Sequence, residues 1–378
     1  MSEWPMVKLG EYCDVIMGQA PKGIDVNEDL MGLPLIAGAG DFSSTGVEVS
    51  KWTEKPTKTC IINDIILSVR ATVGTYRFAD RDYCLGRGVA ALRAKDNLDQ
   101  KYLSFVIDFY RTKLLSAARG ATFLQISKAD IETLMIPLPP LGEQKRIAEI
   151  LGGVSKAINE IHTEIKRVES LCGTLVSLYA EDQSTKKLED LATLSGGLSL
   201  GSHRKNKPHS VGYLRVANVF WGKILYDEIK ELNCTDQEFE RTLLQDGDVL
   251  ITEAHANRFQ VGRSAVFRGE EQALVFQNHL FRARPNKNMD SDVLAAMLSS
   301  VAVRRQLYQM AKTTSGLNTI SISQVRSLQV PVLDATKQTE LLSFLQESNK
   351  LRHLLHRKLS LLQELQKSLA TRAFAGLL

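Results

Sequence analysis

Apolar residues between positions 147 and 179 recur at alternating spacings of four and three. The series is Ile147, Leu151, Val154, Ile158, Ile161, Ile165, Val168, Cys172, Leu175 and Tyr179. This heptad spacing predicts a long helix whose apolar seam packs against another helix. The Pro-rich segment 136–140 comes just before it, and proline cannot continue a helix because its ring removes an N–H donor. We therefore expect a helix over residues 144–182, in which roughly 35 residues would form a rod of about 50 Å at ~1.5 Å per residue.

A second stretch, from about Thr336 to Ala373, has a broader apolar stripe. Its members are Leu341, Leu345, Leu355, Leu359, Leu362, Leu365 and Leu369. Two helices of equal length, each with one apolar face, can cover each other within one chain. We expect an antiparallel coiled coil in which the two flanking globules are related by pseudo-twofold symmetry. The predicted seam consists of Ile147, Leu151, Val154, Ile158, Ile161, Ile165, Val168, Leu175, Leu341, Leu345, Leu355, Leu359, Leu362 and Leu369.

The second half of the chain repeats the first. Segments 7–11, 63–68, 126–131 and 134–138 match segments 186–190, 247–252, 320–325 and 328–332. Both copies reach a glycine at the same step, Gly18 and Gly197. The predicted order is a first domain over 1–143, a helix over 144–182, a second domain over 183–335 and a helix over 336–378.

Each domain is predicted to be mixed α/β. Residues rich in β-branched side chains predict strands at 61–69 and 248–252, and shorter ones at 35–37 and 213–216. Amphipathic spacing predicts helices at 102–115 and 293–310. The Gly-rich segments 38–46 and 194–201 are predicted loops.

Composition narrows the class of protein. The chain has 378 residues, 24% of them charged, and a net charge of +4, which permits binding to nucleic acid without arguing for it. No apolar run reaches the roughly 18 residues of a membrane span, and no signal peptide precedes the first domain. The five cysteines are scattered without a C-x-x-C pair, which indicates reduced thiols, no zinc site and a cytoplasmic location.

Signatures of catalysis are absent from the sequence. It contains no phosphate-binding G-x-x-x-x-G-K-[ST] loop, no H-E-x-x-H and no Asn/Asp-Pro-Pro-aromatic tetrapeptide. Gly197–Gly201 fits G-x-S-x-G, but a nucleophile elbow needs a strand before it and a helix after it. A basic loop follows instead, and Ala20 occupies the position of Ser199 in the first copy. We predict a non-catalytic chain.

Polar and basic loops differ between the copies where they follow matched strands. Lys and Arg bind phosphates, and Arg, Asn, Gln, Ser and Thr read base edges. Solvated surface loops are the alternative interpretation of such charge runs. The candidate DNA-binding residues are Lys22, Arg70, Thr72, Arg77, Arg87, His203, Arg204, Lys205, Lys207, His255, Asn257, Arg258 and Gln260.

The segment Ile136-Pro137-Leu138-Pro139-Pro140-Leu141-Gly142-Glu143-Gln144 resembles the I-P-L-P-P-L-x-E-Q transition of the specificity (S) subunits of type I restriction-modification systems. Segments 8–11 and 64–68 and the duplicated domain–helix plan extend the resemblance over the whole chain. The second transition keeps only Pro331 and Gln338.

The resemblance implies a DNA reader in which each domain recognises one half of a bipartite target and the helix pair sets the gap. It implies double-stranded DNA, two methyltransferase subunits and restriction subunits as partners, and no membrane. The chain itself would hold no cofactor and no metal. S-adenosylmethionine, ATP and magnesium would be bound by the partner subunits.

Two other classes of function are alternatives. A stand-alone methyltransferase would bind S-adenosylmethionine by itself. A structural adaptor would use its duplicated domains to bind protein, and its binding would not show the salt dependence of phosphate contacts.

Overall fold

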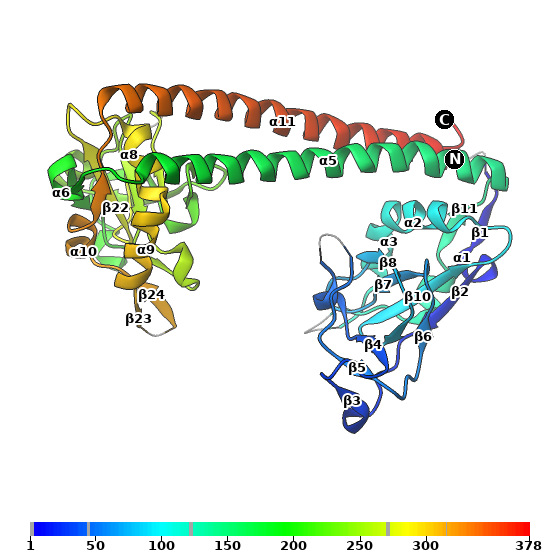
Figure 1. Cartoon of the computed structure of the whole chain (residues 1–378). Helices are drawn as coiled ribbons and strands as arrows, with labels where there is room; N and C mark the ends of the chain where they lie inside the picture. The colour runs from blue at the N-terminus through cyan, green and yellow to red at the C-terminus, as the bar shows by residue number, and fades with distance from the viewer. Residues whose placement is uncertain (1–3, 44–45, 121–123, 270–272, 315) are drawn as a thin grey trace. The chain divides into compact units, whose positions relative to one another are not determined.

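The chain forms two compact units in the computed structural model, which describes residues 4–43, 46–120, 124–269, 273–314 and 316–378. One unit comprises Met1–His162 and Arg357–Leu378, and the other comprises Thr163–His356. Both long helices, α5 (Leu141–Ala180) and α11 (Ala335–Ala375), are divided between the units. The predicted scheme set the helices apart from the globules, whereas each globule here includes part of both helices (Figure 1).

The first unit is built on two small sheets. Strands β2 (Cys13–Met17), β10 (Val89–Ala94), β7 (Ile65–Ser68) and β8 (Tyr76–Phe78) form an antiparallel sheet in that order. The second sheet has the order β3 (Val26–Asn27), β5 (Trp52–Thr53), β4 (Leu33–Ile36), β9 (Tyr83–Leu85) and β6 (Thr59–Cys60). Helices α2 (Gln100–Phe109), α3 (Arg111–Ala117) and α4 (Lys128–Glu132) accompany the sheets, and β1 (Met6–Lys8), which leads into α1 (Leu9–Tyr12), pairs with β11 (Met135–Pro137).

The second unit repeats this plan. Its four-stranded sheet has the order β13 (Ala192–Gly196), β22 (Leu280–Pro285), β18 (Val249–Thr252) and β20 (Ser264–Val266). Strand β12 (Thr185–Lys187), followed by α6 (Leu188–Leu191), pairs with β25 (Gln329–Pro331), as β1 pairs with β11. The strand order of the four-stranded sheet is the same in both units, so the predicted duplication of a mixed α/β domain is confirmed.

The remaining elements of the second unit are short. The strands are β14 (His209–Leu214), β15 (Val219–Phe220), β16 (Lys223–Ile224), β17 (Lys230–Cys234), β19 (Ala254–His255), β21 (Leu274–Phe276), β23 (Lys312–Thr314) and β24 (Leu317–Thr319). The helices are α7 (Asp236–Thr242), α8 (Ser291–Ser299), α9 (Val301–Met310) and α10 (Ile322–Arg326). One-turn 3-10 helices are η1 (Gly23–Asp25) and η2 (Ala39–Asp41) in the first unit, and η3 (Ser202–Arg204), η4 (Val216–Asn218) and η5 (Arg258–Gln260) in the second.

A buried ion pair recurs at the same place in both copies. Arg93 donates two hydrogen bonds to the Asp64 carboxylate, at 2.9 and 2.7 Å, and Arg284 does the same to Asp248, at 2.7 and 2.8 Å. Each aspartate also accepts a backbone N–H three residues earlier, from Ile61 and from Gln245. The carboxylate therefore closes the turn that precedes the central strand, which is why the strand predicted over 61–69 begins only at Ile65.

Other predicted bounds also shift. The helix expected over 102–115 is broken at Tyr110, and that over 293–310 is broken at Ser300, which is extended (φ −60°, ψ 152°). The strand expected over 213–216 is β14, and Val216 lies in η4. The loop expected over 194–201 was wrong for its first three residues, because they pair with β22.

Within each unit the two long helices run antiparallel. In the first unit, Gln366 donates to Ser155 Oγ at 2.7 Å, and Arg146 donates to the Leu378 carbonyl at 2.8 Å, so rising numbers on α5 meet falling numbers on α11. In the second unit Tyr179 near the end of α5 contacts Glu340 near the start of α11.

All fourteen predicted seam residues are buried or half-buried. Leu365, placed in the stripe by its spacing, is instead exposed. The helix ends also enter the globular cores. Phe374 of α11 is buried in the first core, and Val176 and Ala180 of α5 are buried in the second.

No helix in the described part of the chain is long and apolar enough to cross a membrane. The same residues contain no group of three or more His, Cys, Asp or Glu side chains arranged to hold a metal ion.

Candidate nucleic-acid interface

A hollow of about 610 Å³ in the first unit brings together three of the predicted residues, Arg70, Thr72 and Arg87. Its wall includes the backbone of 37–40 and 86–88. Gly86 and Gly88 are required there, because a Cβ atom would lie 2.8 Å from the Ile36 carbonyl oxygen and 2.4 Å from that of Ala37. Because these backbones approach each other closely, glycine backbone forms part of the lining beside Arg70 and Arg87.

Arg70 and Arg87 are exposed, and neither side chain has an ion-pair partner among the described residues. Ala71 between Arg70 and Thr72 has a positive φ of 60°, an uncommon conformation for alanine that turns the chain sharply here. A guanidinium without a partner presents its planar N–H donors to phosphate oxygens or to the O6 and N7 atoms of guanine. The hollow is therefore suited to an anionic, hydrogen-bonding ligand.

Arg77 and Lys22 do not belong to this group. Arg77 donates from Nε and Nη2 to the Ser43 carbonyl, at 2.9 and 2.6 Å, and from Nη1 to the Tyr76 carbonyl at 2.8 Å. Its guanidinium thus holds the loop after η2, whereas the sequence predicts that Arg77 binds DNA. Lys22 is exposed just before η1, outside the lining of the hollow.

Backbone hydrogen bonds identify the corresponding position in the second unit. The N–H of Val69 donates to the Gly88 carbonyl at 2.9 Å, and that of Glu253 donates to the His279 carbonyl at 3.0 Å. The N–H of Ile126 donates to the Val69 carbonyl, and that of Ile320 donates to the Glu253 carbonyl, each at 3.0 Å. Ala254 and Asn278 therefore stand where Arg70 and Arg87 stand in the first unit.

The same backbone frame carries different polar groups at this position. Beside Ala254 and Asn278, the second unit has Glu253 and His279 where the first has Val69 and Gly88, and the Glu253 and His279 side chains meet at 2.5 Å. Close by, His255 Nδ1 lies 2.9 Å from the Asn257 amide, and Asn257 Oδ1 accepts the Phe259 amide at 2.9 Å. Gln260 ends the same turn and is half-buried.

The basic loop 203–209 is mostly tied into the second domain. Arg204 is buried and donates to the Glu238 carboxylate at 3.2 Å, to the Asn233 carbonyl at 3.1 Å and to the Ser199 carbonyl. The sequence predicts that Arg204 contacts DNA, whereas in the structure its guanidinium is enclosed among acceptors of its own domain. Lys207 donates to the same carboxylate at 2.6 Å, whereas His203 and Lys205 are exposed.

Glu238 is the acceptor that organises this loop. The hydrogen bond from Lys207 lowers the pKa of Glu238 to about 2, and the contacts from Thr235 and Arg204 act in the same direction against the effect of burial. The carboxylate is thus ionised throughout the neutral range, and the loop is held by charge.

The Arg258 side chain is half-buried, whereas the side chain of its neighbour Phe259 is exposed. Arg258 donates to the Ala311 carbonyl at 2.8 Å and lies over the Tyr308 ring, 4.5 Å from its centroid. Phe259, which is not among the predicted DNA-binding residues, is 61% exposed and stacks on Tyr308 with the ring centroids 4.7 Å apart. The sequence signal for Phe259 is a single aromatic residue within a predicted polar loop.

Comparison with known proteins shows a similarity to one family over part of the chain. Residues 1–170 match the model of the type I restriction modification DNA specificity domain. A putative type I restriction enzyme MjaX specificity subunit of Methanocaldococcus jannaschii is 37% identical over 170 residues, 44% of this chain and 39% of that protein. The type I restriction enzyme EcoKI specificity subunit of Escherichia coli is 27% identical over 292 residues, 71% of this chain and 62% of that protein. The matched part thus spans less than two thirds of either relative.

Solved structures share the fold along the whole chain. The S subunit of a type I restriction-modification system from M. genitalium superposes with a TM-score of 0.55 at 16% identity, covering 99% of this chain and 96% of that one. A chain from a structure concerned with assembly and conformational transition of the type I system gives 0.62 at 17% identity, covering 99% and 98%. Over its first 170 residues, this chain is thus similar to the type I restriction modification DNA specificity domain.

Proposed function

We propose that this chain is the DNA-reading specificity subunit of a type I restriction-modification complex. The observation that carries the proposal is the repeated backbone frame with unlike polar groups at its equivalent position. Arg70 and Arg87 stand in the first unit where Ala254 and Asn278 stand in the second. Two domains that share a scaffold but carry different donors and acceptors suit a target made of two unlike half-sites.

In the first unit, Arg70 and Arg87 would donate to phosphate oxygens or to guanine, and the Thr72 hydroxyl would add a donor or acceptor at the same rim. In the second unit, His255, Asn257 and Gln260 offer mixed donors and acceptors, with His203 and Lys205 as exposed cationic or hydrogen-bonding neighbours. These assignments follow from chemistry and exposure.

The helices would set the distance between the half-sites. Helices α5 and α11 contain 40 and 41 residues, so each has a length of about 60 Å at ~1.5 Å per residue. The end of each helix is buried in a domain core. A change in helix length would therefore change the spacing of the half-sites.

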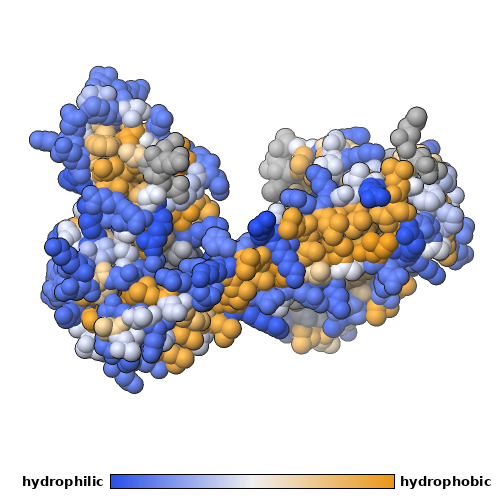
Figure 2. Space-filling view, turned by 90° about the horizontal axis from the view of Figure 1, so that it is seen from above, coloured by the Kyte–Doolittle hydropathy of each residue, from blue (hydrophilic) through white to orange (hydrophobic). Residues whose placement is uncertain are grey.

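Catalysis would belong to other subunits. We propose that this chain carries no cofactor and acts in the cytoplasm. Two methyltransferase subunits would bind S-adenosylmethionine, and restriction subunits would use ATP and magnesium. Exposed leucines one heptad apart, Leu354 and Leu361 on α11 and Leu171 and Leu178 on α5, are candidate contacts for these proteins. Figure 2 shows hydrophobic residues gathered in a broad band over the first unit, on the face seen from above.

The proposal is tested with the full chain assembled with its methyltransferase subunits. The complex is incubated with a library of random duplexes, and the bound or methylated duplexes are sequenced. We expect one bipartite target, with affinity that falls with salt by about 0.9 log units per phosphate contact for each log unit of salt. An Arg70→Ala, Arg87→Ala double variant should relax one half-site and leave the other unchanged.

A structural adaptor would give a different result. It would bind partner proteins independently of salt, and the assembled complex would select no duplex sequence. That outcome would refute the proposal.

A further inference from the structure

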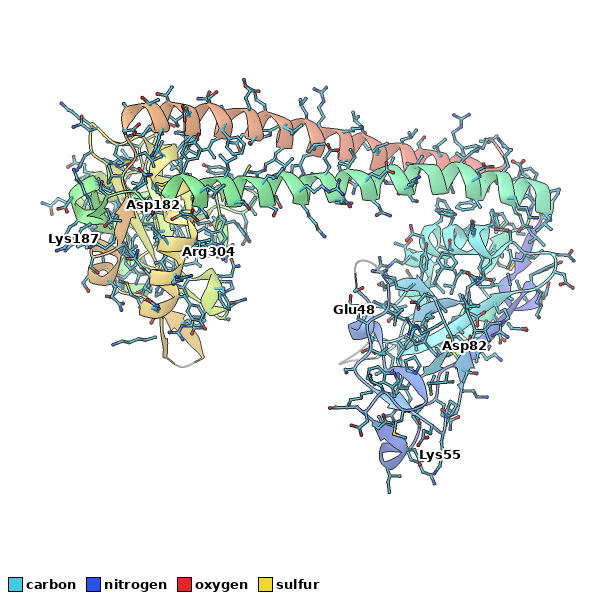
Figure 3. All side chains as sticks on the ribbon, viewed as in Figure 1. Glu48, Lys55, Asp82, Asp182, Lys187 and Arg304 are labelled. Atoms are coloured by element: carbon cyan, nitrogen blue, oxygen red, sulfur yellow. The ribbon has the colours of Figure 1, made fainter. Side chains whose placement is uncertain are left out.

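Aromatic and arginine side chains of the second unit form a connected surface outside the predicted basic loops. We call it the α9 strip: Phe220, Trp221, Arg304, Tyr308, Phe259 and Arg258. Arg304 and Tyr308 lie one helical turn apart on α9, so they share a face of that helix. Figure 3 shows Arg304 on α9, well away from Lys187 at the start of the domain.

One end of the strip is a stacked aromatic pair. Phe259 and Tyr308 lie at an interplanar angle of 26°, and Arg258 covers the Tyr308 ring, fixed by its bond to the Ala311 carbonyl. Tyr308 thus contacts the Phe259 ring, and Arg258 contacts Tyr308. Phe259 therefore presents a fixed apolar side chain to solvent, and little side-chain entropy is lost when it binds.

The other end is the turn between β15 and β16. The Arg304 guanidinium lies 5.1 Å from the Trp221 ring centroid, and that of Arg263 lies 4.9 Å from the Phe220 ring. Arg304 is exposed, whereas Arg263 is buried with its Nε atom unpartnered among the described residues. An arginine held over an aromatic ring by a cation–π contact keeps its N–H donors for a phosphate.

Charge distinguishes this surface from an ordinary apolar docking site. Between Asp292 and Asp334 the sequence contains no Asp or Glu, but it contains Arg304, Arg305, Lys312 and Arg326. This segment includes the whole of α9. The positive field favours a polyanion over an apolar or basic protein surface.

We propose that the α9 strip binds double-stranded DNA at the second half-site, with Arg304 on a phosphate and Phe259 against the 5-methyl group of a thymine in the major groove. The inference rests on the proposed function and specifies how the second domain reads its target. Arg258 acts as a positioning residue, because it holds Tyr308 and through it Phe259. Phe259 is the specificity-determining group.

The test uses the full chain assembled with its methyltransferase subunits and the duplex target that the unmodified complex selects. Phe259→Ala should lower affinity about tenfold and relax the preference for thymine at one position of the second half-site only. Replacing that thymine with uracil should weaken the unmodified complex by a similar factor and leave Phe259→Ala unaffected. Arg304→Ala should weaken binding to all sequences and reduce the salt slope by about one contact.

Phe78→Ala is the matched control, because Phe78 is an exposed phenylalanine of the first domain in edge contact with Tyr76, 6.1 Å away. It should leave the second half-site unchanged. Phe259→Leu keeps an apolar side chain and guards against misfolding, and it should retain most of the affinity.

The outcomes separate the two proposals. If the unmodified complex selects no bipartite duplex, the proposed function itself fails. If it selects one and both Phe259→Ala and Arg304→Ala bind it as tightly and as selectively, the α9 strip is not a DNA contact. Loss of subunit assembly with unchanged DNA selectivity would overturn the inference too, because the strip would then be a protein-docking surface.

Discussion

The rings of Tyr102 and Phe374 meet edge to face inside the first unit, with centroids 5.7 Å apart and an interplanar angle of 70°. Tyr102 belongs to α2 and Phe374 to the last turns of α11, far apart in sequence. Phe109 and Tyr110 complete the cluster, 4.8 and 6.4 Å from Phe374. The C-terminal end of the chain therefore completes the core of the first domain.

Phe374→Ala should destabilise the first unit by about 3 to 5 kcal/mol, because it removes a buried ring and leaves a cavity. Chemical denaturation followed by circular dichroism measures the change. Leu377→Ala is the control, since Leu377 is 60% exposed near the same end and should cost little. Equal effects of the two substitutions would show that Phe374 is not part of the core.

Ile161→Lys should destabilise the helix pair by several kcal/mol, because Ile161 is 5% exposed and an unpaired buried charge is costly. Leu171→Lys on the same helix is the matched control, since Leu171 is 63% exposed. Thermal unfolding of both variants tests the prediction. An unchanged melting temperature for Ile161→Lys would place that residue outside the buried seam.

Gln144→Ala should cost about 2 kcal/mol or more, because the Gln144 side chain is fully buried and joins three backbone groups. It accepts the Asp99 amide at 2.8 Å and donates to the carbonyls of Asn97 and Pro139 at 3.0 and 2.9 Å. The substitution would leave the Asp99 amide, at the start of α2, without its acceptor.

Gln338→Ala is the counterpart in the second unit and should cost less. Gln338 is half-buried and donates to the Leu333 carbonyl at 2.9 Å. Urea denaturation of both variants compares the two helix entries. A larger loss at Gln338 than at Gln144 would contradict the asymmetry.

Glu238→Gln should destabilise the second unit at neutral pH by on the order of 2 kcal/mol and change little in strong acid. The pKa of Glu238 is depressed from an ordinary value of 4.5 to about 2, so its stabilising effect is present above 4.5 and is lost as pH falls toward 2. Unfolding free energies of the two proteins, measured between pH 2 and 7, should therefore converge at the acid end. A difference independent of pH would exclude the ion pairs with Lys207 and Arg204 as the cause.

Lengthening both helices should move the half-sites apart. About four residues inserted into α5 and α11 at matched positions add roughly 6 Å of helix, so the unread gap should grow by about two base pairs while each half-site is kept. Sequencing of the methylated target in a host expressing the assembled system measures the gap. An unchanged gap would refute the role of the helices as a spacer.

The sequence by itself determined the features that depend on local periodicity. The seam from Ile147 to Leu175 could be predicted because the facing of each residue on a helix follows from spacing alone. The matched segments 63–68 and 247–252 likewise predicted a duplicated domain, since like sequences form like strands. The breaks at Tyr110 and Ser300 were missed because apolar spacing continues across them.

Only the tertiary structure decided which polar side chains are free. Arg204 and Arg70 look alike in sequence, but Glu238 and the Ser199 and Asn233 carbonyls enclose the first, whereas glycine backbone leaves the second open. Phe259 became a candidate because Tyr308, from another element, supports it. Such distinctions depend on contacts between segments that are distant in sequence. A local sequence pattern does not predict a hydrogen-bond or stacking partner that only folding brings close.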